Sequence, residues 1–208
     1  MSQRPVPSET ASPTTQPTIE PIQRSDPNVF GVAIFLTSEA IFFLTLIITY
    51  IVYHGESTAA PTPAEALNIP YTAVFTVFLL SSSVTMVMAT SRLGHNDAFG
   101  ARLWLLATIL LGAIFLIGQG YEYFRLYTDN VTISRNLWSS TFFTLTGFHG
   151  LHVLIGLIAM AVLASVVATA TDHPRAASGF EAISLYWHFV DAVWVVIFSV
   201  VYLWTLLS

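Results

Sequence analysis

Five ionisable side chains stand inside otherwise apolar stretches of this sequence: Glu39, His149, His152, His188 and Asp191. His149 and His152 are three residues apart, and so are His188 and Asp191, so each pair would share one face of a helix. A charged carboxylate near the centre of a bilayer costs about 2.5–3.5 kcal/mol on insertion scales. We therefore expect the five groups to meet at similar depth, buried against partners or held neutral.

Three kinds of chemistry suit this set of residues. The first is an interhelical hydrogen-bond cluster in which Glu39 and Asp191 each face a histidine, since buried polar groups in membranes usually find such partners. The second is a b-type haem held by one histidine from each of two helices, such as His152 and His188. The third is a proton path through both carboxyl groups and the histidine pair. The residue types favour the hydrogen-bond cluster and leave the haem site and the proton path open. His149 and His152 alone offer too few ligands for a stable metal site.

A further charged pair, Glu122 and Arg125, lies toward the end of another apolar stretch. Their spacing allows an ion pair at the membrane interface, with the arginine stem extended along the apolar surface. Exposed pairs of this kind contribute little to stability. We expect an outer interfacial pair, with docking to a partner protein as the alternative.

The elements that hold these residues must be membrane-spanning helices. Of the 208 residues, 54% are hydrophobic and 9% are charged, and the mean hydropathy is +0.69; an average soluble domain is about 25% charged. Apolar stretches cover residues 30–53, 71–90, 103–120, 142–167 and 183–207, and about 20 helical residues cross a bilayer. Period-two alternation is absent, and no proline falls inside a stretch. The sequence therefore predicts an all-α, polytopic membrane protein with a bundle of five transmembrane helices.

The predicted organisation is a tail followed by one membrane domain. Residues 1–28 contain six of the ten prolines and eight serines or threonines, which predicts a disordered cytoplasmic tail before a five-helix domain at 29–208. Five arginines would lie on the side of the N-terminus and two on the other side. This bias predicts a cytoplasmic N-terminus and an external C-terminus.

Composition also excludes several kinds of function. The net charge is −5 and the arginines form no basic patch, so nucleic acid is not an expected partner. Cysteine is absent, which excludes disulfides, thiolate metal sites, iron–sulfur clusters and covalently attached c-type haem.

Capping residues and aromatic residues mark the predicted helix ends and membrane interfaces. Asp97 is suited to be the N-cap of the third helix, and Ser178 with Glu181 has the pattern of a capping box that opens the fifth helix. Nine aromatic residues near the outer ends of the stretches predict an interfacial belt: Tyr50, Tyr53, Tyr71, Tyr121, Tyr123, Tyr127, Trp138, Tyr202 and Trp204.

Four motifs in this chain resemble those of one known family. Residues 146–153, TGFHGLHV, resemble its G-x-H-G-x-H-V segment, and residues 186–194, YWHFVDAVW, resemble its W-H-F-x-D-x-V-W segment. Residues 38–43, SEAIFF, resemble S-E-x-x-F-F, and residues 119–123, QGYEY, resemble Q-x-x-E-Y. In this order the motifs identify the chain as similar to subunit III of haem–copper terminal oxidases.

The resemblance implies a non-catalytic subunit of a proton-pumping oxidase in the bacterial plasma (inner) membrane. Subunit III of this family binds subunit I, supports its proton uptake and helps to keep its active site intact, while haem and copper lie in subunits I and II. The expected partners are therefore subunits I and II and membrane lipid. The chain itself is expected to hold no cofactor, with a bound phospholipid left open. The five buried ionisable residues become a cluster that is structural or coupled to proton movement.

This sequence differs from many members of the family in its predicted number of helices. Many members of the family have seven helices, two of them at the N-terminus forming a lipid-filled cleft, whereas this sequence resembles the five-helix bacterial form. The donor is decided in subunit II; cytochrome c is favoured, and a quinol is the alternative. A hypothesis of a different class is a free-standing five-helix proton channel or transporter that uses the same cluster.

Overall fold

The computed structural model describes residues 27–54, 66–169 and 173–204, and over these ranges all regular structure is helical. The long helices are α1 (Pro27–His54), α3 (Ile69–Gly94), α4 (Ala98–Thr128), α5 (Leu137–Thr169) and α6 (His173–Phe198). A short π-helical segment, Ser199–Leu203, follows α6. Among the described residues, five helices are long and apolar enough to cross a membrane. The chain is therefore a multi-pass membrane protein with the predicted all-α fold.

The predicted tail stays a prediction. Residues 1–26 lie outside the described residues. Helix α1 begins at Pro27, and its candidate membrane span is Phe30–His54, while the predicted domain boundary at residue 29 stays a prediction. Proline is well placed in a first helical turn because the backbone N–H that it lacks would have no intrahelical partner there.

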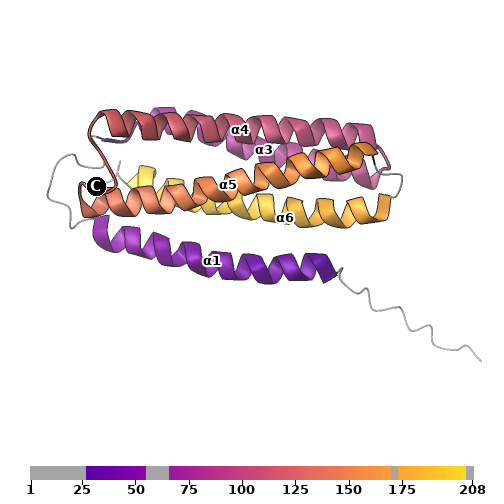
Figure 1. Ribbon diagram of the computed structural model, residues 1–208, viewed down its shortest axis with the longest axis horizontal. Helices are drawn as coiled ribbons and strands as arrows, with labels where there is room; N and C mark the ends of the chain where they lie inside the picture. Colours follow the sequence, from indigo (N-terminus) through magenta and orange to yellow (C-terminus); the bar gives the residue numbers. More distant parts are fainter. Residues whose placement is uncertain (1–26, 55–65, 170–172, 205–208) are drawn as a thin grey trace, which may run out of the picture.

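Four of the helices form a closed ring, and the fifth is attached to its side. α3 packs on α4, α4 on α5 and α5 on α6, and α6 returns to α3. α1 packs chiefly against α5 and α6, on the side of the molecule away from α4 (Figure 1). Of the most apolar window of each spanning helix, the buried share is lowest in α1, at 17%. Most apolar side chains of α1 are thus left to contact lipid or another protein.

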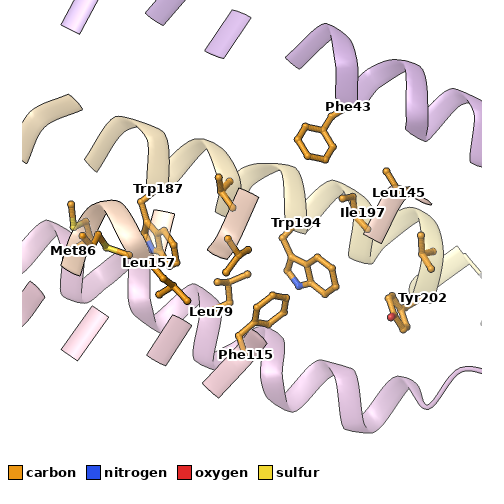
Figure 2. Packing of buried hydrophobic residues seen from close by; sticks show 14 of the residues in the cluster. Phe43, Leu79, Met86, Phe115, Leu145, Leu157, Trp187, Trp194, Ile197 and Tyr202 are labelled. Carbon is orange, nitrogen blue, oxygen red and sulfur yellow. The ribbon is translucent and has the colours of Figure 1, made fainter. Parts of the chain in front are cut away.

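Trp187 on α6 is fully buried and lies near Leu157 and Met86 in the core (Figure 2). A β-carbon at Gly112 of α4 or at Gly156 of α5 would lie within 2.9 Å of indole atoms, so both glycines are needed for this close approach. The indole N–H of Trp187 donates to the hydroxyl of Ser82 on α3 at 2.9 Å. One fully buried side chain therefore contacts all three of the other ring helices.

The helices extend beyond the apolar stretches of the sequence. α4 continues to Thr128 instead of ending at residue 120, and α5 begins at Leu137 instead of residue 142. In a membrane the backbone groups are best satisfied inside a helix, so helical structure continues through the polar residues of the interface.

One of the two predicted N-terminal signals is confirmed. The carboxylate of Asp97 accepts a hydrogen bond from the N–H of Gly100 at 2.8 Å and caps α4. The capping box at Ser178 and Glu181 is wrong, because α6 begins at His173 and Ser178 lies inside the helix. Pro174 is accommodated in the first turn of α6, so the helix can start earlier than the box suggests.

The predicted aromatic belt is divided between the surface and the core. Tyr121 and Tyr127 are exposed, as an interfacial belt requires, but Tyr50, Trp138 and Tyr202 are fully buried. The indole N–H of Trp138 donates to the Tyr50 hydroxyl at 3.2 Å. A buried Tyr or Trp needs a partner for its polar tip, and here these tips find partners within the bundle.

Candidate functional site

The predicted cluster of ionisable residues is two separate hydrogen-bonded groups with one histidine outside both. The first group joins α1 to α5: Nε2 of His152 lies 3.0 Å from Oε2 of Glu39. The second joins α3 to α6 through Ser83, His188 and Asp191. A single network through all five residues stays a prediction. The predicted pairing of Glu39 with a histidine is present, whereas Asp191 is bonded to a serine.

The hydrogen bond between Glu39 and His152 requires a proton in addition to the hydrogen on Nδ1 of His152. Nδ1 of His152 lies 2.7 Å from the carbonyl oxygen of Phe148, which can only accept, so Nδ1 carries a hydrogen. The contact between Nε2 and Oε2 then needs a second proton, either on the imidazole or on the carboxyl group. In both arrangements the pair has no net charge, which suits its depth in the membrane. The ring of Phe43 packs edge-on against His152, with the ring centres 4.9 Å apart.

The Ser83 group has a defined direction of hydrogen bonding. The Ser83 hydroxyl donates to Oδ2 of Asp191, and Nδ1 of His188 lies 3.1 Å from the same hydroxyl oxygen. Because the hydroxyl hydrogen is directed to the carboxylate, Nδ1–H of His188 is the donor to Ser83. Within the described part of the chain, Oδ1 of Asp191 is buried and has no hydrogen-bond partner.

His149 is packed as an aromatic ring. It is fully buried, and neither of its ring nitrogens has a hydrogen-bond partner among the described residues. It stacks on Trp194 of α6 with ring centres 4.8 Å apart, and the edges of Phe43 and Phe115 close the other sides. Figure 2 shows Trp194 and Phe115 meeting in this part of the core. The indole N–H of Trp194 donates to Thr76 of α3 at 3.0 Å.

This arrangement does not suit a haem held by His152 and His188. His152 is directed to α1 and His188 to α3, so the two imidazoles do not face a common space. Over the described ranges, no group of three or more His, Asp or Glu residues is arranged to hold a metal ion.

Glu122 and Arg125 do not form the expected interfacial ion pair. Glu122 is buried and accepts hydrogen bonds from the hydroxyls of Thr72 at 2.9 Å and Tyr202 at 2.8 Å. Arg125 instead donates through Nη2 to the carbonyl oxygen of Ala66 at 2.7 Å. In the described part of the chain, no ion pair within 4.0 Å joins the two residues. Hydroxyl donors satisfy Glu122 inside the bundle, and the π-helical segment brings Tyr202 to it.

Several partners of the ionisable residues were not among the predicted site residues. Ser83 lies in a run of three serines in an apolar helix, which is an available signal for a polar contact. Trp187 and Trp194 are spaced by seven residues and so lie on one face of α6. Nothing in the local sequence marks Thr72 as a partner of Glu122.

The fold and these polar groups define a class of protein: a multi-pass helical membrane protein with protonatable groups within its spanning helices. Comparison with known proteins then gives the family. The sequence profile described as "Cytochrome c oxidase subunit III" matches residues 23–206. The chain belongs to the cytochrome c oxidase subunit III family.

Individual relatives are similar in sequence to this chain over most of its length. A protein of Corynebacterium diphtheriae named "Cytochrome c oxidase subunit 3" is 40% identical over 175 residues, covering 83% of this chain and 85% of the relative. A protein of the same name from Synechocystis is 40% identical over 182 residues, covering 86% and 76%. A "Cytochrome bo(3) ubiquinol oxidase subunit 3" of Pseudomonas putida is 36% identical over 175 residues, covering 84% of each chain. Subunit III of a terminal oxidase implies a complex with other oxidase subunits.

Proposed function

We propose that this chain is a non-catalytic subunit that binds subunits I and II of a proton-pumping haem–copper oxidase and supports proton uptake by subunit I. The observation that carries the proposal is the family match over residues 23–206. The arrangement of the ionisable residues supports it, since they are engaged in contacts between helices of this chain. Haem and copper lie in subunits I and II in this proposal, and the bacterial plasma membrane holds the complex with the N-terminus in the cytoplasm.

Within this function, we assign the Glu39–His152 pair to the proton-coupled part and the Ser83 group to the structural part. The Glu39–His152 pair contains a proton that can sit on either group, and the Glu39 side chain is 19% exposed on the outside of the ring. A neighbouring subunit could therefore exchange a proton with it. Asp191 is buried, and its Oδ2 is bonded to Ser83, so it is suited to holding α3 and α6 together.

Cytochrome c is the electron donor that we favour for the complex. Relatives from Corynebacterium diphtheriae and Synechocystis carry the name cytochrome c oxidase subunit 3. The relative from Pseudomonas putida, named as a ubiquinol oxidase subunit, keeps a quinol as the alternative. The two donors are distinguished by assaying the purified complex with each one.

The experiment that tests the function compares matched oxidase complexes with and without this chain. The chain is first purified in mild detergent, and the proteins that accompany it are identified by mass spectrometry; subunits I and II are expected. Initial oxygen consumption is then followed over many turnovers. The depleted complex should reduce oxygen at first, after which its turnover decays or its proton uptake slows.

Two results would contradict the proposal. Immediate and complete loss of oxygen reduction, with the haems and copper of subunit I intact, would mean that this chain carries part of the chemistry. Rapid proton flux across liposomes that contain this chain alone would support the free-standing channel or transporter instead.

A further inference from the structure

Two adjoining cavities lie at the end of the bundle where α3 begins and α4 ends. The larger has a volume of about 500 Å³ and is bounded by the start of α3, Arg125 and Asp129. The smaller has a volume of about 350 Å³, shares Asn68 and Arg125 with the first, and is bounded also by Tyr121. Together they form what we call the α3/α4 cavity. It is remote from Glu39 and Asp191, which lie near the middle of their helices.

Arg125 is the charged donor of the α3/α4 cavity. Its hydrogen bond to the carbonyl oxygen of Ala66, at 2.7 Å, fixes the guanidinium against the wall of the cavity. In the described part of the chain, Nε of Arg125 is buried and has no hydrogen-bond partner. A guanidinium has five N–H donors and no acceptor, so it suits a ligand with several anionic oxygens, such as a phosphodiester.

Asp129, the C-cap residue directly after α4, supplies the opposite charge about one turn beyond Arg125. Asp129 follows Arg125 by four positions, which corresponds to about 6 Å along the helix axis. Asp129 lies nearer the C-terminal end of α4, and its carboxylate is exposed. The cavity thus presents a cation at the deeper level and an anion closer to water.

Phospholipids with an amino headgroup carry their charges in the complementary order. The phosphodiester lies nearer the hydrocarbon, and the primary ammonium lies further out. We propose that the α3/α4 cavity binds the headgroup of phosphatidylethanolamine, with its phosphate on Arg125 and its ammonium on Asp129. Its acyl chains then run along α4, where Ile117 and Phe124 are exposed.

The charges around the cavity select among the common headgroups. A primary ammonium donates hydrogen bonds to a carboxylate, whereas a quaternary choline has no N–H to donate. Phosphatidylglycerol offers Asp129 no positive charge, and the nearby carboxyl group of Glu122 makes a net negative ligand less favourable still. The expected order of affinity is therefore phosphatidylethanolamine, then phosphatidylcholine, then phosphatidylglycerol.

The test is native mass spectrometry of the full chain in detergent, titrated with these three lipids carrying identical acyl chains. The wild-type chain should bind one phosphatidylethanolamine about tenfold more tightly than phosphatidylcholine, the effect of one hydrogen bond to a charged group. Arg125→Gln should lower the affinity for phosphatidylethanolamine about tenfold or more. Arg102→Gln removes the same charge from the opposite end of α4 and should leave the affinity unchanged.

Asp129→Asn tests the headgroup assignment at an exposed position that is not expected to disturb folding. It should abolish the preference for phosphatidylethanolamine over phosphatidylcholine while binding of phosphatidylcholine persists. Equal binding of the three lipids by the wild-type chain, or unchanged binding by both Arg125→Gln and Asp129→Asn, would overturn the proposal. Soluble phosphoethanolamine is the competitor: displacement of the lipid at equal concentration would also overturn it, since the ligand would then be a soluble phosphate ester.

Discussion

His149 and His152 lie on neighbouring positions of one face of α5 and differ in what they contact. His152 bonds to Glu39 through Nε2 and to the carbonyl oxygen of Phe148 through Nδ1. His149 has aromatic rings on its sides and, among the described residues, no hydrogen-bond partner for either nitrogen. The same residue type is therefore a hydrogen-bonding group in one position and a packing group in the other.

Substitution by phenylalanine should separate these two roles. His149→Phe keeps the stacking on Trp194 and removes two unsatisfied nitrogens, so the free energy of unfolding should change by less than about 1.5 kcal/mol. His152→Phe leaves Glu39 without its partner and should cost about 1–3 kcal/mol. The measurement is unfolding in mixed micelles titrated with a denaturing detergent. Equal losses for the two variants would show that the assignment is wrong.

Ser83 is the shared hydrogen-bond partner of Asp191 and His188. Its substitution tests how much these bonds contribute to stability. Ser83→Ala removes two hydrogen bonds, and at about 0.6 kcal/mol for each bond in a membrane protein it should lower stability by about 1 kcal/mol. Asp191→Leu should be worse, because Ser83 and His188 both lose the carboxylate that orders them.

A double-mutant cycle measures whether Ser83 and Asp191 act together. Because the two side chains share a hydrogen bond, Ser83→Ala and Asp191→Asn should together cost less than the sum of their separate effects. Additive effects would mean that the two side chains contribute independently.

Among the elements, α6 has the central place, because its two buried tryptophans reach the other three helices of the ring. Trp187 contacts Gly112 on α4 and Gly156 on α5 and bonds to Ser82 on α3. Trp194 bonds to α3, stacks on α5 and packs against Phe115 of α4, with ring centres 4.8 Å apart. Without a hydrophobic force between helices in lipid, this packing and these hydrogen bonds hold the ring together.

Adding one methyl group beside Trp187 should therefore destabilise the ring. Gly112→Ala would place a β-carbon 2.8 Å from the indole and should cost about 1–3 kcal/mol through overpacking. Gly120→Ala on the same helix is the matched control, because a β-carbon there would meet no described atom within 4 Å. It should be neutral or stabilise α4 by up to about 1 kcal/mol through helix propensity. Thermal unfolding in detergent compares the two, and a loss at Gly120 as large as at Gly112 would contradict this account.

At the scale of the whole molecule, α1 is a side helix on a four-helix ring. Its chief neighbours are α5 and α6, and it has hydrogen bonds to α5 through Glu39 and Tyr50. Few side chains of α1 are buried as Phe43 is. Much of the surface of α1 is apolar and exposed. In the oxidase complex, this surface is available to lipid or to a neighbouring subunit.

A chain divided between residues 59 and 60 tests how α1 is held. The two fragments, co-expressed, should associate in the membrane, because helices that are stable alone can assemble in a second step. His152→Phe should lower the amount of the α1 fragment that purifies with the rest several-fold, whereas Ser83→Ala should not change it. Equal effects of the two substitutions would mean that the Glu39–His152 bond does not hold α1.

The sequence by itself determined that the chain crosses the membrane, which five helices among the described residues can do so, and to which family it belongs. Hydrocarbon permits few backbone structures, so length and apolar composition were sufficient for the helices. The four motifs were sufficient for the family, which the profile match over residues 23–206 confirms.

The tertiary structure decided which polar groups meet. Residues three apart in the sequence share a helical face, but the facing helix decides what they contact. His188 and Asp191 are thus joined through Ser83, 105 and 108 residues away in the chain, and Glu122 is bonded to Thr72 and Tyr202 instead of Arg125. These contacts depend on how four helices are rotated against one another around Trp187 and Trp194, and helix rotation is set by packing between helices, which no local pattern of residues contains.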